Sequence, residues 1–173
     1  MKIQPLVGIL MGSDNDYEVM RETAKILKQF QVPFEMIVSS AHRTPERTAS
    51  YVRAAKARGM RVLIAGAGAA PHLAGVVAAE TVLPVIAVPI DATALQGLDA
   101  LLAMVQMPAG IPVATMAIGQ AGARNAGIFA VQMLATTEPE LTKKLEEFKL
   151  DMARSVIEKS AKLQQRLHAD GLV

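Results

Sequence analysis

The amino-acid sequence predicts an α/β protein, a three-layer αβα sandwich built around a five-stranded parallel sheet. Short aliphatic runs alternate with helical patterns five times along the chain. These runs are hydrophobic throughout rather than at every second residue, which is typical of strands buried on both faces. The connections between runs and helical patterns are short, which favours right-handed crossovers between parallel strands.

Each of the five expected strands is one of these aliphatic runs. They cover Leu6–Met11, Phe34–Val38, Arg61–Ala65, Val85–Val88 and Pro112–Ala117. Five parallel strands connected through helices predict the strand order 2-1-3-4-5 of a flavodoxin-like sheet.

Helical patterns fill the intervals after the strands. They cover Tyr17–Phe30, Pro45–Arg58, Pro71–Val82, Ala94–Val105 and Ala121–Ala135. In the second of these helices, Thr44 is expected as the N-cap and Pro45 as the first helical residue. Gly59 is expected to adopt a left-handed conformation just beyond its end.

The last forty residues predict one long helix. Thr137 and Glu140 have the spacing of a capping box, and apolar residues then follow at three- and four-residue steps. A helix that continued to Ala169 would be roughly 45 Å long, against a radius of gyration of ~16 Å for a domain of this size. We therefore expect a flavodoxin-like domain at residues 1–136 and a helical extension of it at residues 137–173 that contacts another subunit. Two shorter helices joined by a bend are the alternative.

Composition excludes several classes of protein. The chain has 173 residues, of which 51% are hydrophobic and 20% charged, and this predicts a folded domain rather than a disordered chain. It has no cysteine, and its three histidines lack metal-ligand spacing, so no metal is expected. A net charge of +2 with 3% aromatic residues argues against nucleic-acid binding. Glycines and prolines interrupt the apolar region Val62–Ile90, and no signal peptide is apparent, so we expect a cytoplasmic protein that does not bind membranes.

Three loops that follow expected strands carry the candidate functional residues, because ligands bind at the carboxyl edge of parallel α/β sheets. In the first loop, Gly12 allows a ligand to approach the backbone closely, and Ser13 with free helix-start amides suits a phosphate. Asp16 suits a ribose diol, because its carboxylate can accept hydrogen bonds from both hydroxyls. Ordinary helix capping explains the same cluster equally well.

The second loop contains Ser40, His42 and Arg43. The guanidinium of Arg43 can bind a phosphate in a bidentate manner, and Ser40 can donate a hydrogen bond to the same group. His42 would lie beside that phosphate, and an imidazole can give and take a proton near neutral pH. A capping histidine beside a surface arginine is the alternative.

The third loop, Gly66–Gly75, consists mostly of small residues. It has neither the glycine spacing of a dinucleotide-binding loop nor the lysine of a Walker loop. Such a loop predicts a close-fitting wall for a flat ring or a small neutral molecule. His72 is either a second polar contact or a helix cap, and His168 in the C-terminal helix is expected to face solvent.

These three loops, in this order, resemble the N5-carboxyaminoimidazole ribonucleotide mutase family, the PurE enzymes of purine synthesis. The resemblance extends from Val7 to Leu134 and rests on collinear motifs. The motifs are M-G-S-x-x-D at Met11–Asp16, S-A-H-R-T-P at Ser40–Pro45, A-G-A-G at Ala65–Gly68, L-P-V-I at Leu83–Ile86, Q-M-P-x-G-I-P-V-A-T at Gln106–Thr115 and A-I-G-x-A-G-A-x-N-A at Ala117–Ala126.

The resemblance implies a homo-octamer with active sites bordered by neighbouring subunits, and a reaction that uses no metal, nucleotide or organic cofactor. The substrate would be a ribonucleotide whose carboxylate moves from an exocyclic nitrogen to C4 of an aminoimidazole ring by way of trapped carbon dioxide. His42 would protonate the departing nitrogen and then remove the C4 proton. The substrate-binding residues implied by position are Gly12, Ser13, Asp16, Ser40, Arg43, Gly68, Ala69, His72 and Leu73.

The chain departs from the usual pattern of this family at Asn15, at Tyr17 and in the third loop. That loop usually reads G-A-G-G-A-A-H-L-P-G and in this chain reads G-A-G-A-A-P-H-L-A-G. Ala69 therefore replaces a glycine, and the proline stands at Pro71 with Ala74 at its usual place. Ala69 would matter if that position required a positive φ.

Three other functions stay open at this point. A related carboxylase adds free carbon dioxide to aminoimidazole ribonucleotide, but that branch carries lysine where this chain has Arg43, and its third loop differs. A non-catalytic nucleotide-binding module would need the phosphate contacts but not His42. A flavin-binding protein would need aromatic residues to stack on the ring, and the chain is poor in them.

Overall fold

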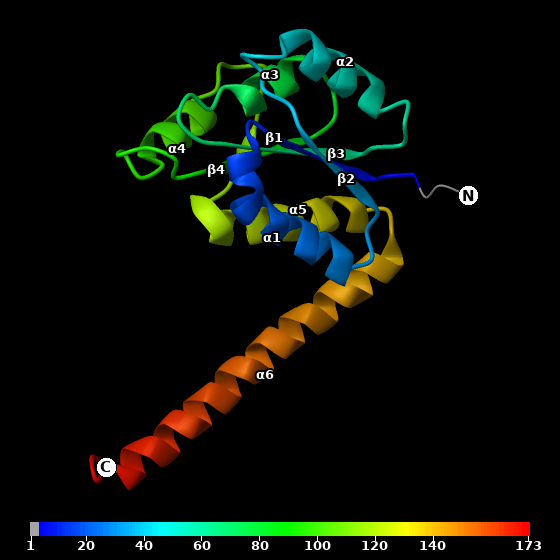
Figure 1. Ribbon diagram of the computed structural model, residues 1–173. Coiled ribbons are helices and arrows are strands. Elements are labelled where there is room, and N and C mark those ends of the chain that lie inside the picture. Colours follow the sequence, from blue (N-terminus) through cyan, green and yellow to red (C-terminus); the bar gives the residue numbers. More distant parts are fainter. Residues whose placement is uncertain (1–3) are drawn as a thin grey trace. The chain divides into compact units, whose positions relative to one another are not determined.

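Five parallel strands in the order β2-β1-β3-β4-β5 form the central sheet of this computed structural model, which describes residues 4–173 (Figure 1). The strands are β1 (Val7–Met11), β2 (Phe34–Val38), β3 (Val62–Ala67), β4 (Val85–Pro89) and β5 (Ala114–Thr115). Every residue of β1, β3 and β4 is buried, because helices cover both faces of these inner strands. The predicted fold class and strand order are confirmed.

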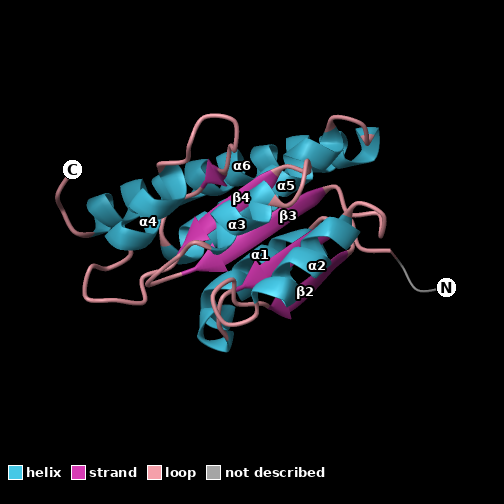
Figure 2. Cartoon of the chain, turned by 90° about the horizontal axis from the view of Figure 1, so that it is seen from above, coloured by secondary structure: helices cyan, strands magenta, loops and turns pink. Residues whose placement is uncertain are grey.

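Helices form the two outer layers of the sandwich. On one face lie α1 (Tyr17–Gln29) and α5 (Gly119–Ala135), and on the other lie α2 (Pro45–Ala55), α3 (Leu73–Ala79) and α4 (Leu98–Val105), as Figures 1 and 2 show. A short 3-10 helix, η1 (Asp14–Asp16), precedes α1. Polar contacts connect α1 to α5, since the Thr23 hydroxyl donates to the carbonyl of Ala123 at 2.7 Å and buried Glu22 accepts from Arg124 at 2.9 Å.

Several element boundaries differ from the prediction for local backbone reasons. The edge strand β5 spans only two residues, because it pairs with β4 alone, through Ala114 and Thr115. Helix α4 begins at Leu98 rather than Ala94, because Gln96 and Gly97 have φ values of +52° and +82°, which an α-helix does not accommodate.

The helix after the second strand, α2, starts as predicted and ends three residues early. Thr44 is its N-cap, but the Thr44 hydroxyl donates to the carbonyl of Ser40 at 2.9 Å instead of accepting from a helix amide. The helix ends at Ala55, and Gly59 then has the expected left-handed conformation, with φ of +92°. Helix α3 is shorter than predicted at both ends, since it spans Leu73–Ala79 rather than Pro71–Val82.

The residues from Ala135 to Val173 form a compact unit of their own, and those up to Leu134 form the other. The C-terminal unit contains α6 (Pro139–Ala169), a single helix of 31 residues, so the bent alternative is wrong. The predicted capping box is also wrong. Glu138 is the N-cap, without a side-chain cap bond, and the helix starts at proline, whose fixed φ suits the first helical position.

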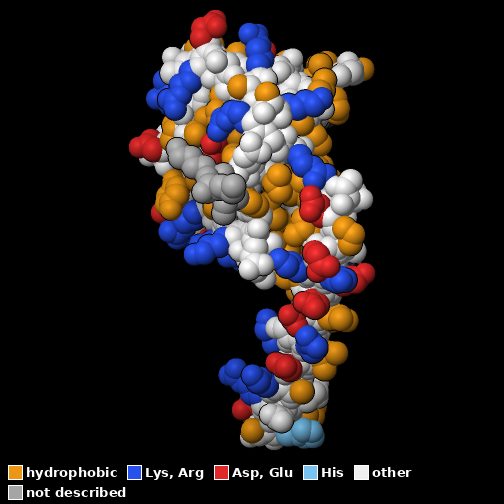
Figure 3. Space-filling view, turned by 90° about the vertical axis from the view of Figure 1, so that its right-hand side faces the viewer, with side chains coloured by type: hydrophobic (Ala, Val, Ile, Leu, Met, Phe, Trp, Pro, Cys, Tyr) orange, Lys and Arg blue, Asp and Glu red, His pale blue; other side chains and the backbone are white. Residues whose placement is uncertain are grey.

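Helix α6 carries charged side chains of both signs interspersed with hydrophobic ones (Figure 3). Its exposed apolar residues include Leu150, Met152, Val156, Ile157 and Leu163. His168 is exposed, as expected. Across residues 4–173, none of the helices combines the length and the apolar character needed to cross a bilayer.

Candidate functional site

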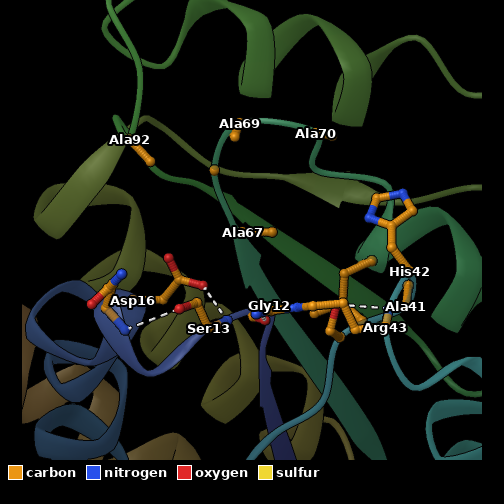
Figure 4. Close-up of a pocket in the computed structure, with 14 residues that line it drawn as sticks. Gly12, Ser13, Asp16, Ala41, His42, Arg43, Ala67, Ala69, Ala70 and Ala92 are labelled. Atoms are coloured by element: carbon orange, nitrogen blue, oxygen red, sulfur yellow. Dashed lines mark hydrogen bonds between the residues drawn. The ribbon is translucent and has the colours of Figure 1, made fainter.

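A pocket of about 420 Å³ lies where the loops that follow β1, β2 and β3 meet (Figure 4). Nine of the ten residues predicted for the site line it, namely Gly12, Ser13, Asp16, Ser40, His42, Arg43, Gly68, Ala69 and Leu73. The tenth, His72, does not line the pocket but contacts His42. The remaining lining residues are Asn15, Ala41, Ala67, Ala70 and Ala92.

In the first loop, backbone amides donate hydrogen bonds to side chains of the same loop. The backbone N–H of Ser13 donates to Oδ2 of Asp16 at 2.9 Å, and the N–H of Asn15 donates to the Ser13 hydroxyl at 3.3 Å. Capping is therefore present, as the alternative interpretation predicted. Burial raises the pKa of the Asp16 carboxyl, and hydrogen bonds from the backbone of Ser13 and Gly12 partly oppose that shift. Figure 4 shows the same carboxylate on the pocket wall, so capping and ligand binding are compatible.

Arg43 connects the first and second loops. Its Nη2 donates to the carbonyl of Gly12 at 3.1 Å, and its Nε donates to the hydroxyl of Ser40 at 3.4 Å. The backbone N–H of Arg43 donates to the same hydroxyl at 3.2 Å. Below the loop, the buried hydroxyls of Ser39 and Thr48 lie 2.8 Å apart and fasten it to α2. The guanidinium is thus held in place before any anion binds.

The third loop forms the apolar wall, and its backbone needs a residue without a side chain at Gly68. A Cβ at this position would lie 2.5 Å from Cβ of Ala92 and 2.8 Å from the carbonyl oxygen of Ile90. Ala69 has a φ of +57°, a left-handed conformation that favours glycine, so the condition under which an alanine at this position would matter is met. Leu73, at the start of α3, is buried against the pocket.

Ala92 is the lining residue that the three-loop analysis of the sequence missed. It follows β4, whose carboxyl end lies at the same edge of the sheet as those of β1 and β3. Ligands bind at the carboxyl edge of parallel α/β sheets, so a search of the loop after the fourth strand, as well as of those after the first three, would have found Ala92.

The two histidines of the site form a pair. Nε2 of His42 and Nδ1 of His72 are 2.8 Å apart, and the rings meet edge to face with centroids 5.0 Å apart. One ring must donate this hydrogen bond and the other must accept it, so at least one of the two is neutral while the bond exists. His72 thereby orients the imidazole of His42, which reaches the pocket from the β2–α2 loop (Figure 4).

The site combines groups for three tasks. Arg43 with Ser13 and Ser40 offers donors for an anion, and Asp16 offers acceptors for hydroxyls. The imidazole of His42 can transfer a proton beside a wall of small apolar residues. Among residues 4–173, the acidic and histidine side chains form no group of three placed to hold a metal ion.

Comparison with known proteins agrees with this geometry. The family described as AIR carboxylase matches residues 6–155. The chain is 54% identical over 162 residues to the N5-carboxyaminoimidazole ribonucleotide mutase of Pyrococcus horikoshii, covering 94% of this chain and 90% of that protein. It is 52% identical over 161 residues to the phosphoribosylaminoimidazole carboxylase of Schizosaccharomyces pombe, covering 93% of this chain and 29% of that longer protein. The crystal structure of Treponema denticola PurE superposes with a TM-score of 0.83 at 28% identity, over 92% of this chain and 98% of that one.

Proposed function

Since the chain belongs to the AIR carboxylase family, we propose that the pocket at the carboxyl edge of its sheet is the active site of an isomerase. The protein converts N5-carboxyaminoimidazole ribonucleotide to 4-carboxy-5-aminoimidazole ribonucleotide, a step of purine biosynthesis. The observation that carries the assignment to this pocket is the position of His42, an oriented imidazole between an anion-binding loop and an apolar wall.

The first part of the site holds the nucleotide. Arg43, Ser13 and Ser40 bind the phosphate, because they present a fixed guanidinium and two hydroxyls on one side of the pocket. Asp16 accepts hydrogen bonds from the ribose hydroxyls. The first and second loops therefore anchor the substrate by groups that do not react, which fixes the aminoimidazole ring against the third loop.

The reaction then moves one carboxylate from nitrogen to carbon, and the proton that His42 gives up is replaced by one from C4. The bond between the exocyclic nitrogen and the carboxyl carbon breaks, carbon dioxide departs, and the electron pair left on nitrogen takes a proton from protonated His42. The ring carbon C4 next attacks carbon dioxide and forms the new carbon–carbon bond. His42, now neutral, removes the proton from C4, so that it ends in the state in which it began.

The third loop retains the carbon dioxide between these steps. Carbon dioxide is small, neutral and apolar, and the wall made by Ala67, Gly68, Ala69 and Ala70 offers a matching surface. Leu73 closes this wall from α3. A wall without polar side chains also keeps water away from the intermediate.

We also propose that the protein is a cytoplasmic homo-octamer in which residues 137–173 contact other subunits. Support for self-association comes from the exposed apolar residues of α6, such as Leu150, Val156 and Ile157. A helix that leaves such residues in water gains stability when another surface covers them.

The test is an assay on N5-carboxyaminoimidazole ribonucleotide without ATP or metal, in buffer with isotopically labelled bicarbonate. We expect rapid formation of the 4-carboxy product with little label, because the carbon dioxide stays in the site. Extensive labelling, or turnover only from uncarboxylated aminoimidazole ribonucleotide, would assign the chain to the carboxylase reaction instead.

The His42→Asn variant tests the role of the histidine in the same assay. Asparagine is close in size but cannot carry a proton between two atoms, so we expect loss of turnover with substrate binding retained. Binding is measured by isothermal calorimetry, and His168→Asn in α6 is the matched control. Normal turnover by His42→Asn would refute the acid–base assignment.

A further inference from the structure

A second, smaller groove adjoins the pocket and adds one positive charge that the site described above does not use. The groove has a volume of about 290 Å³ and shares Ser13, Ser40 and Arg43 with the pocket. The residues that it adds are Asp14, Val38, Thr44 and Arg47. It therefore continues the proposed phosphate site toward α2.

Arg47 differs from Arg43 and Arg53 because, among residues 4–173, its guanidinium forms no hydrogen bond or ion pair. Arg43 already donates to Gly12 and Ser40, and Arg53 is paired with Glu80 at 2.6 Å. Arg47 is exposed, and within residues 4–173 its side chain has no hydrogen-bond or ion-pair partner. A free guanidinium at the end of a phosphate site is available to the ligand.

The first turn of α2 places this charge at the groove. Arg47 is the third residue of α2 and follows Arg43 by four positions, and both line the same groove. Glu46, its neighbour in the sequence, forms no ion pair or hydrogen bond with Arg47 among residues 4–173. The one acidic residue of α2 therefore leaves the charge of Arg47 unpaired.

The groove also contains one acidic residue, Asp14. Its Oδ1 accepts a hydrogen bond from the Ser13 hydroxyl at 3.1 Å. Two arginines against one carboxylate leave the groove with one excess positive charge. A phosphate that is bound by Ser13, Ser40 and Arg43 lies at the junction of pocket and groove, where that excess charge attracts it.

We propose that Arg47 is a second phosphate-recognition residue, which draws the phosphorylated end of the substrate into the junction and gives the enzyme its preference for the nucleotide over the nucleoside. This role rests on the proposed active site, since it requires the phosphate to bind beside Arg43. Arg47 contributes to capture and affinity and takes no part in the proton transfers of His42. Its effect is therefore on KM and on the association rate.

The experiment compares Arg47→Gln with Lys56→Gln, which removes the same charge from the far end of the same helix. We expect Arg47→Gln to raise KM for the ribonucleotide about five- to tenfold at about 10 mM salt, with kcat within about twofold of wild type. The difference should shrink at about 200 mM salt, because ions screen an exposed charge. Lys56→Gln should keep the wild-type KM, and Arg47→Lys should recover part of the loss.

A substrate without the phosphate separates recognition from a structural effect. The corresponding nucleoside should react equally slowly with wild type and Arg47→Gln, because the group that Arg47 recognises is missing. The proposal is overturned if Arg47→Gln matches Lys56→Gln, if the loss is in kcat alone, or if the nucleoside shows the same loss. Wild-type protein that failed to turn over the ribonucleotide would instead overturn the proposed function.

Discussion

Replacing Ala69 by glycine should stabilise the protein, because Ala69 has a φ of +57°. A left-handed conformation costs a residue with a Cβ about 1–2 kcal/mol. Glycine avoids this cost but loses about 0.5–1 kcal/mol more conformational freedom on folding than alanine does. Ala69 is exposed, so removal of its methyl group forfeits little burial. The balance is a gain of about 0.5–1 kcal/mol in the free energy of unfolding.

Thermal unfolding measures this gain. For a chain of this length, 1 kcal/mol corresponds to a change in Tm of about 2–4 °C. Wild type and variant must be compared at one protein concentration, because association also shifts Tm. We expect Ala69→Gly to unfold about 1–4 °C above wild type.

The neighbouring residue provides a control of the opposite sign. Ala70 is also exposed and lines the same pocket, but its φ is not positive. Ala70→Gly therefore brings only the entropic cost of glycine and should lower the stability by about 0.5–1 kcal/mol. If Ala69→Gly is no more stable than wild type, or if both variants shift Tm in the same direction, left-handed strain at Ala69 is not the cause.

Two other predictions follow from polar contacts. His72→Asn should lower kcat/KM about tenfold, because it removes the 2.8 Å contact that orients His42. The change in Tm should be small, because His72 is exposed and the loop stays folded. An unchanged rate in a steady-state assay would refute this prediction. Hydrogen bonds from Lys25 and Arg124 lower the pKa of Glu22 below its ordinary value of 4.5, so this carboxylate contributes stability above pH 4.5 that is lost as the pH falls below it. Glu22→Gln should accordingly be less stable than wild type at pH 7, and its free energy of unfolding should approach that of wild type under acid conditions. Urea titrations at several pH values measure this, and a stability difference that stays constant across the range would contradict the linkage.

The sheet could be predicted from the sequence because its inner strands are apolar at every position. The runs around Ile9, Ile64 and Ile86 are fully buried, as the inner strands of a parallel sheet covered by helices on both faces are. Short connections then limited the topology to right-handed crossovers. The edge strand β5 was the poorest prediction, because pairing with one neighbour, and not hydrophobicity, determines where it ends.

The residues that line the site could be predicted from the sequence better than the contacts between them. Residue types made Arg43 a candidate for anion binding, but its hydrogen bonds to Gly12 and Ser40 depend on where two loops meet in space. For the same reason His72 was expected in the pocket wall, and the structure places its ring against His42 instead. The failed capping box has a local cause, since Thr137 and Glu140 have the right spacing but Pro139 occupies the first helical position.

The third loop combines an alanine in a left-handed conformation, Ala69, with a proline two residues later, Pro71. In the unfolded loop, Ala69 and Pro71 each have fewer backbone conformations open to them than a glycine would have. Pro71 also restricts Ala70, the residue before it, to a narrower range of backbone angles. The strain at Ala69 is then offset in part by a smaller loss of entropy on folding, and the folded loop is stiffer. In the proposed mechanism this wall holds carbon dioxide between two bond changes, and a stiff wall suits that role. Ala69→Gly should therefore release more carbon dioxide to solvent, which the labelled-bicarbonate assay detects as greater incorporation of label.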